Sequence, residues 1–149
     1  MSNEIDFLMG VAELAATRSS AKRLQVGAVV TDSSLNIVAS GYNGTVRGFH
    51  TNDCEFEQYS DYACGPVLVT DENITIHAEQ NLIAHAARRG ISIDGGTVVL
   101  THSPCTKCTS LLIQCGIKEI VYNSKHRSFD ETNSLYGNYI KLTQYVGKS

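Results

Sequence analysis

Two short segments, each at the start of a predicted helix, most constrain how this chain can fold. His77-Ala78-Glu79 opens one apolar periodic stretch, and Pro104-Cys105-Thr106-Lys107-Cys108 opens the next. Cys105 and Cys108, three residues apart, lie on one helical face and can chelate one metal ion. The positive end of the helix dipole favours their thiolates. With His77 as a third ligand, the two helices must begin beside each other.

The number of protein ligands indicates what the metal does. Zinc takes Cys and His ligands in tetrahedral geometry, and three protein ligands leave one position open, as in catalytic sites. Water in that position can have its pKa lowered toward neutrality. Glu79, two residues from His77, lies beside the metal without binding it, so its carboxylate can move a proton to a substrate. The sequence therefore predicts Zn²⁺ held by His77, Cys105 and Cys108, with Glu79 as the catalytic residue.

Each segment alone is also typical of proteins without a catalytic zinc. A Cys-x-x-Cys pair is a redox motif or half of a structural zinc site in many proteins. A histidine at a helix start is often a cap or a satisfied core residue. A non-catalytic zinc-stabilised binding module would have no use for Glu79, so Glu79→Ala separates it from an enzyme. A thioredoxin-like redox protein would have no use for the His-x-Glu segment, and stoichiometric zinc that resists mild oxidants would count against it. The two segments together form the signature of the zinc-dependent nucleobase deaminases.

Hydrophobic patterning predicts the fold class. Helical periodicity predicts helices over 3–18, 77–89, 105–115 and 130–137. Apolar, β-branched runs predict strands over 24–31, 35–42, 97–102, 117–122 and 139–146. An opening hairpin followed by strand-helix-strand units predicts an α/β fold, a three-layer α/β/α sandwich around a mixed sheet of about five strands. No element is predicted over 44–76, which is polar and poor in periodicity.

Length and composition narrow the class further. The chain has 149 residues, so we expect a single domain over 1–149. A net charge of −3 argues against a nucleic-acid partner. The N-terminus lacks the features of a signal peptide, and no apolar run approaches the roughly 20 residues that span a bilayer. We expect a cytoplasmic protein without a membrane partner, in which five cysteines, an odd number, serve as metal ligands or buried thiols.

Five segments together carry a resemblance to a known family. They are Gln25-Val26-Gly27-Ala28, Gly41-Tyr42-Asn43-Gly44, residues 76–81, residues 103–108 and residues 116–122. Over most of residues 5–145 the chain resembles the cytidine deaminase-like superfamily, and the second and fifth segments narrow this to its dCMP deaminase branch. The resemblance implies a hydrolase of an amidine C–N bond that converts dCMP to dUMP and ammonia for thymidylate synthesis. Water activated at the zinc would attack C4 of cytosine, while Glu79 would move protons to N3 and then to the leaving amine.

The same resemblance implies which residues hold the substrate. Asn43 would contact the base or the deoxyribose, although an Asn-Gly pair is also typical of a turn. Lys22 and Arg23 fit the family's basic segment for the 5′-phosphate, with a solvated charged pair as the alternative. Ser103 belongs to the same substrate-binding set. His126 stands where the family often has an aromatic residue, so it would stack on the substrate, bind phosphate, or simply be exposed.

Regulation is also implied by the resemblance. Many dCMP deaminases are hexamers that dCTP activates and dTTP inhibits, each bound with Mg²⁺ at a subunit interface. We therefore expect a homohexamer whose allosteric nucleotide site has basic groups for the triphosphate. Its residues would be Asn43, Gly44, Arg47, His50, Asp53 and Arg88. Arg88 and Arg89 could instead be only the cations that suit a helix C-terminus.

Some relatives also bind a second, structural zinc before the catalytic histidine. The potential ligands here are His50, Cys54 and Cys64. Thr75, two residues before that histidine, is a poor ligand where some relatives have an acidic one. We therefore expect one zinc ion, with Cys54 and Cys64 as loop-packing thiols.

Other deaminases remain as alternatives, namely those of cytidine, guanine or tRNA adenosine. A tRNA substrate usually needs a more basic surface than a net charge of −3 offers. Cytidine deaminases typically place a glycine after the first cysteine of the pair, where this chain has Thr106.

Overall fold

The structure is a computed structural model that describes residues 2–59, 61–62 and 64–147. Its helices are α1 (Asn3–Ala16), α2 (Ala78–Arg89), α3 (Thr106–Gln114) and α4 (Phe129–Tyr136). The strands of the central sheet are β1 (Gly27–Thr31), β2 (Ile37–Tyr42), β7 (Thr97–His102), β8 (Glu119–Ser124) and β9 (Lys141–Gln144). Two further strand pairs lie outside this sheet, β3 (Gly44–Thr45) with β6 (Thr75–Ile76), and β4 (Glu55–Tyr59) with β5 (Pro66–Thr70).

The central sheet is mixed and has the strand order β2-β1-β7-β8-β9. Strand β1 runs antiparallel to both of its neighbours, whereas β7, β8 and β9 are mutually parallel. Parallel neighbours need crossover connections, and α3 and α4 provide them between β7, β8 and β9. The predicted mixed sheet of five strands is thus confirmed, and the predicted helices and core strands lie within a few residues of their expected bounds.

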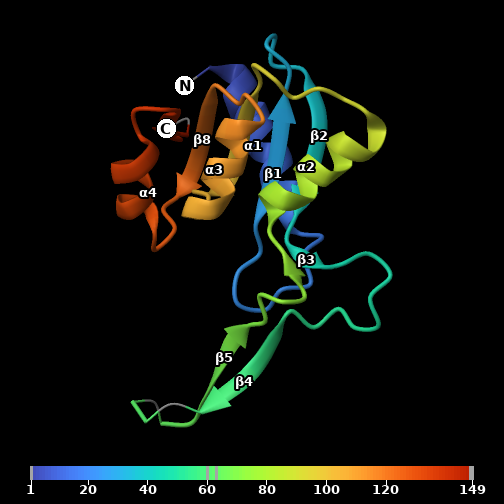
Figure 1. The fold of residues 1–149 in the computed structure, drawn as a ribbon, viewed down its shortest axis with the longest axis vertical. Coiled ribbons are helices and arrows are strands. Elements are labelled where there is room, and N and C mark those ends of the chain that lie inside the picture. The colour runs from blue at the N-terminus through green and yellow to red at the C-terminus, as the bar shows by residue number, and fades with distance from the viewer. Residues whose placement is uncertain (1, 60, 63, 148–149) are drawn as a thin grey trace.

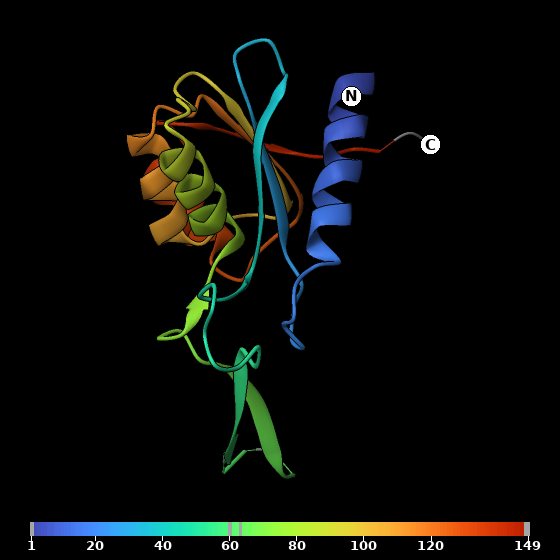
Figure 2. The same ribbon diagram turned by 90° about the vertical axis from the view of Figure 1, so that its right-hand side faces the viewer.

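Alternating side chains of the sheet form two apolar clusters, one on each face. On the first face Val29, Val99 and Val121 pack against Leu8 and Met9 of α1. Figure 2 shows α1 alone on this side of the sheet, with α2 and α3 on the opposite side. The molecule therefore has the three layers that the sequence predicts.

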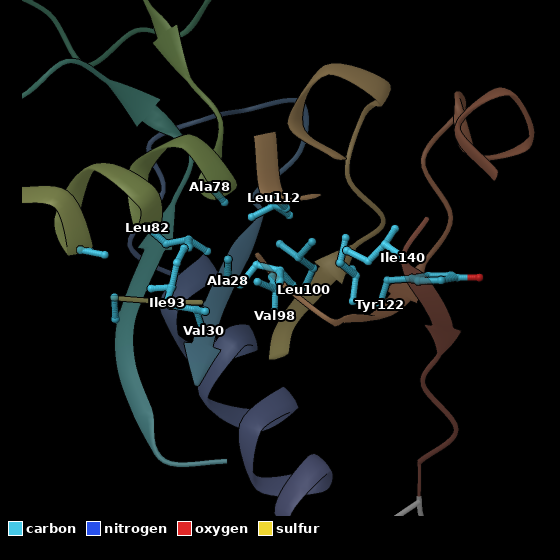
Figure 3. Packing of buried hydrophobic residues seen from close by; sticks show 14 residues of the cluster. Ala28, Val30, Ala78, Leu82, Ile93, Val98, Leu100, Leu112, Tyr122 and Ile140 are labelled. Atoms are coloured by element: carbon cyan, nitrogen blue, oxygen red, sulfur yellow. The ribbon is translucent and has the colours of Figure 1, made fainter. Parts of the chain in front are cut away.

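In the second cluster, the sheet packs against the two helices that carry the predicted catalytic motifs. Ala28, Val98 and Leu100 of the sheet pack against Leu82 of α2 and Leu112 of α3 (Figure 3). These five side chains are completely buried. Because α2 and α3 rest side by side on one face, their N-termini lie at the same edge of the sheet.

Gly41 of β2 fixes how closely α2 approaches the sheet. A Cβ atom at this position would lie 2.5 Å from the carbonyl oxygen of Ala78 and 2.7 Å from the backbone nitrogen of Leu82. Any larger residue would push the first turn of α2 away from β2. The glycine therefore positions the helix start that bears His77.

Part of the 44–76 segment extends away from the central sheet (Figure 1). This part is the hairpin of β4 and β5, which we call the arm. Glu55 pairs with Thr70 at its base, and Tyr59 pairs with Pro66 near its tip. Most arm residues are exposed on both faces, so the sequence lacks the apolar alternation of a half-buried strand. This explains why no element is predicted there.

No helix in the described part of the chain is both long and apolar enough to cross a membrane.

Candidate active site

The first catalytic motif lies at the N-terminus of α2. His77 is the N-cap residue, and its backbone nitrogen donates to the Gln80 side-chain oxygen at 2.8 Å. Glu79 follows in the first turn, where a negative charge suits the helix dipole. The side chain of Asn81 donates to the carbonyl oxygen of Tyr42 at 2.9 Å, which ties this turn to the end of β2.

The second motif places two thiols beside the His77 ring. Cys105 is the N-cap residue of α3, and its Sγ accepts from the Cys108 backbone nitrogen at 3.4 Å. His77 Nδ1 lies 3.7 Å from Cys105 Sγ and 3.4 Å from Cys108 Sγ. The three donor atoms all lie within 4.8 Å of one another. Two thiols and one imidazole at this spacing fit the donor set of zinc, and the structure brings the three predicted ligands together.

Cys105 and His77 shift the pKa values of each other. Hydrogen bonding from Cys108 and His77 holds the pKa of the Cys105 thiol well below its usual range. The Cys105 sulfur in turn raises the pKa of His77, by accepting its hydrogen bond, to about 9. A thiolate is the form in which cysteine binds a metal, so Cys105 is already in its metal-binding state.

Glu79 is the buried carboxyl of the site. It is 4% exposed, and burial raises its pKa to about 7, although hydrogen bonding from Cys108 and the charge of His77 act in the opposite direction. A carboxyl with a pKa near neutrality both accepts and releases a proton readily, which general acid–base catalysis requires.

A cavity of about 530 Å³ opens beside this cluster. The predicted site residues that line it are Arg23, Asn43, His77, Glu79, Ser103, Cys105 and His126. Lys22 is outside the lining and forms an exposed ion pair with Asp53 at 3.8 Å. Cys108 is buried behind the wall. The structure therefore gathers most of the expected catalytic and substrate residues around one space.

Asn43 braces one wall of the cavity. Its Oδ1 accepts from the Val26 backbone nitrogen at 2.8 Å, and its Nδ2 donates to the Leu24 carbonyl oxygen at 2.8 Å. These bonds hold the segment before β1 against the end of β2. One lone pair and one N–H of the amide are still available for a bound molecule.

Ser103 and His126 connect two loops on the opposite wall. Ser103 Oγ accepts from the His126 backbone nitrogen at 2.7 Å, and the His126 ring contacts Ser128 Oγ at 2.8 Å. Ser103 also donates its backbone N–H to the carbonyl oxygen of Ser124 at 2.8 Å. Burial lowers the pKa of the half-buried His126 ring, which favours its neutral form.

Several residues of the lining were not expected from the sequence. Lys125 and Arg127 flank His126 in the loop after β8, and Glu72 and His102 complete the polar wall. One available signal was position, because loops at the carboxyl ends of adjacent parallel strands meet at one edge of a sheet. Lys125 and Arg127 follow β8 as Cys105 follows β7.

A second cavity, of about 340 Å³, lies on the other side of the Asn43 loop. The expected allosteric residues Gly44 and Arg47 line it, together with Arg18 and His85. The guanidinium of Arg18 lies 5.1 Å from the ring centre of Tyr42. Of the other expected allosteric residues, Asn43 lines the first cavity instead, and His50, Asp53 and Arg88 are exposed and outside the lining of the second.

Cys54 and Cys64 differ in burial. Cys54 is fully buried and lines the first cavity, whereas Cys64 is exposed at the tip of the arm. Within the described residues, the cluster of His77, Cys105 and Cys108 is the one group of three or more potential ligands.

The fold and this cluster define a class. A mixed sheet carrying His-x-Glu and Cys-x-x-Cys at two neighbouring helix starts, with the Glu buried beside the ligands, is the arrangement of the zinc-dependent nucleobase deaminases. Residues 2–124 match the family described as the cytidine and deoxycytidylate deaminase zinc-binding region, and the chain belongs to this family.

Known relatives agree with this assignment. The chain is 32% identical to ComE operon protein 2 of Bacillus subtilis, over 87% of this chain and 64% of that protein, so it spans less than two thirds of that relative. It is 32% identical to the deoxycytidylate deaminase of Homo sapiens, over 87% of this chain and 70% of that protein. The crystal structure of dCMP deaminase from the cyanophage S-TIM5, in complex with dCMP and dUMP, matches with 35% identity and a TM-score of 0.80, over 97% of this chain and 99% of that one.

Proposed function

We propose that this chain hydrolyses dCMP to dUMP and ammonia, as one deaminase domain over residues 1–149. The observation that carries the proposal is the buried Glu79 carboxyl beside His77, Cys105 and Cys108, on a cavity large enough for a nucleotide. The deoxycytidylate deaminases among its relatives support dCMP as the substrate.

The residues of the site divide the chemistry between them. His77, Cys105 and Cys108 would hold the zinc, which acidifies water and so supplies a hydrolytic nucleophile near neutral pH. The Glu79 carboxyl, with its pKa near 7, transfers one proton from the attacking water to N3 of the pyrimidine and then the second proton of that water to the leaving amine. Asn43 positions the segment at 24–26 and has spare hydrogen-bonding capacity for the nucleoside.

A cluster of cations favours a phosphorylated substrate over a free base or nucleoside. Arg23, Lys125 and Arg127 all line the catalytic cavity. The backbone nitrogens of Lys22 and Arg23 donate to one Glu55 oxygen at 2.7 and 3.1 Å, which anchors the loop that bears Arg23. We assign these three cations to the 5′-phosphate, with Lys22 farther out, and His126 and Ser103 to the wall beside the nucleoside.

The second cavity supports a regulatory site. Arg18 and Arg47 provide positive charge there, and Tyr42 and Phe49 provide aromatic rings. Such a lining suits the phosphates and base of a nucleotide. We propose that dCTP and dTTP, with Mg²⁺, act at this site. The homohexamer, the cytoplasmic location and the regulatory roles of His50, Asp53 and Arg88 stay predictions.

Ammonia release tests the function directly. The zinc-loaded chain is incubated with dCMP, deoxycytidine and CMP, with Mg²⁺, and with dCTP or dTTP added in turn. We expect turnover of dCMP alone, raised by dCTP and lowered by dTTP. Turnover that ignores both triphosphates would keep the chemistry and reject the regulatory site. Absence of ammonia from all three substrates would reject dCMP deamination and favour another base or a binding role.

A further inference from the structure

The His77 ring has a second partner outside the metal cluster. Its Nε2 lies 2.9 Å from the Oε2 atom of Glu72, while its Nδ1 faces Cys105 and Cys108. The two ring nitrogens therefore point to different partners, a carboxylate on one side and two sulfurs on the other.

Glu72 is held in place by its own turn. The backbone nitrogen of Asp71 donates to the Cys54 carbonyl oxygen at 2.7 Å, and the Asp71 side chain accepts from the Asn73 nitrogen at 3.1 Å. The nitrogen of Thr75 donates to the Asp71 carbonyl oxygen at 3.1 Å. These bonds fix the backbone of the turn between β5 and β6, and from it the Glu72 side chain, which is 66% exposed, lines the catalytic cavity.

The geometry selects one tautomer of the ring. A carboxylate oxygen is only an acceptor, so at 2.9 Å the His77 Nε2 must carry the hydrogen. In the neutral form that binds a metal, the ring then has its free lone pair on Nδ1, the nitrogen that faces the two sulfurs. Metal-binding histidines commonly donate their other N–H to a carboxylate, which fixes both tautomer and ring orientation.

We infer that Glu72 is a positioning residue for the zinc site: it holds the His77 ring so that Nδ1 is directed at the metal. The inference rests on the zinc site of the proposed function but not on the identity of the substrate. It also gives the connection after the arm a role, because the turn that follows β5 supplies this carboxylate.

The test measures zinc binding rather than turnover. The zinc dissociation constants of Glu72→Ala, Glu72→Gln and the unmodified chain are compared by chelator competition at one pH. Glu57→Gln is the matched control, because Glu57 is an exposed carboxylate on β4 of the arm. We expect zinc binding about 10- to 100-fold weaker for Glu72→Ala, a smaller loss for Glu72→Gln, which keeps an acceptor oxygen, and no change for the control.

Nuclear magnetic resonance of the zinc-loaded protein provides a second measurement. The His77 Nε2 proton should give a slowly exchanging signal that disappears in Glu72→Ala and persists in Glu57→Gln. Unchanged zinc affinity and an unchanged Nε2 proton in Glu72→Ala would overturn the inference. So would an equal loss of affinity in Glu57→Gln, because general charge would then be the cause. If Glu72→Ala does not fold, the zinc affinity and the Nε2 proton of Glu72→Gln are compared with those of Glu57→Gln instead. A protein that binds zinc but does not deaminate dCMP would defeat only the proposed function.

Discussion

Ser103 Oγ accepts the backbone N–H of His126 at 2.7 Å, and this bond ties the loop after β8 to the loop after β7, beside the backbone bond from Ser103 to Ser124. Ser103 is itself buried, so water does not readily replace it as an acceptor. The bond connects the cysteine motif to the loop that bears Lys125 and Arg127. The Ser103 hydroxyl group therefore helps to hold the loop that bears Lys125 and Arg127 in place.

Replacing that hydroxyl group should weaken substrate binding. In Ser103→Ala the His126 nitrogen loses its acceptor, at a cost of about 1–3 kcal/mol. We expect a higher KM for dCMP with zinc content unchanged, measured by steady-state kinetics and metal analysis. Ser110→Ala is the control, because Ser110 is on α3 and its hydroxyl bonds only within that helix in the described structure. Equal KM values for the two variants would contradict the proposed role of the bond.

Removing the cations should separate phosphate recognition from catalysis. A hydrogen bond to a charged group contributes about 1.5–3 kcal/mol, which corresponds to roughly 10- to 100-fold in KM. Arg127→Gln and Lys125→Gln should each raise the KM for dCMP in this range and leave kcat nearly unchanged. Lys118→Gln, a surface change away from the cavity lining, is the control. A fall in kcat without a rise in KM would argue for a catalytic role instead.

Glu79→Gln should abolish turnover and keep the zinc. Loss of a positioned acid–base group lowers rates by roughly 10²- to 10⁴-fold. The amide keeps the size of the side chain, so His77, Cys105 and Cys108 retain their arrangement. Ammonia release and zinc stoichiometry are measured on the same sample. A variant with near-normal turnover would remove Glu79 from the mechanism, whatever its zinc content.

Zinc removal should destabilise the whole domain. The ligands come from α2 and α3, so the ion adds a direct link between two helices that already pack in one apolar cluster on the sheet. A ligand that binds only the folded state stabilises it by about 2.7 kcal/mol at 100 times its dissociation constant. Thermal unfolding with and without a chelator should show this loss, and zinc should reverse it. Cys105→Ser should remove the zinc dependence, whereas Cys64→Ser, at the exposed tip of the arm, should keep it.

Gly41→Ala should destabilise the fold through the backbone of α2. The added methyl group would meet the carbonyl oxygen of Ala78 at 2.5 Å, and overpacking of this kind costs about 1–3 kcal/mol. The melting temperature should fall by about 2–4 °C for each kcal/mol. Gly10→Ala on α1 is the matched control, because nothing lies within 4 Å of its added atom. That change should raise stability slightly, since glycine is a poor helix residue.

The zinc site was predictable from the sequence because its ligands lie within helix-opening motifs. The apolar periodicity put His77 and Cys105 at the starts of two successive predicted helices, and the structure brings the three ligands together. The position of Glu72 was not predictable, because it depends on the path of a turn in a segment without periodicity, whereas the place of Arg127 just after β8 was an available signal. The arm escaped prediction because its strands are exposed on both faces and so lack a periodic apolar pattern.

Strands β3 and β6 pair at the base of the 44–76 segment, which contains the arm. Gly44 lies opposite Ile76 and Thr45 opposite Thr75, so the two ends of this segment are held together close to the central sheet. The entropy of closing a flexible loop grows only with the logarithm of its length, at about 0.6 kcal/mol for each doubling. Residues can therefore be gained or lost at the tip of the arm with little thermodynamic consequence for the zinc ligands.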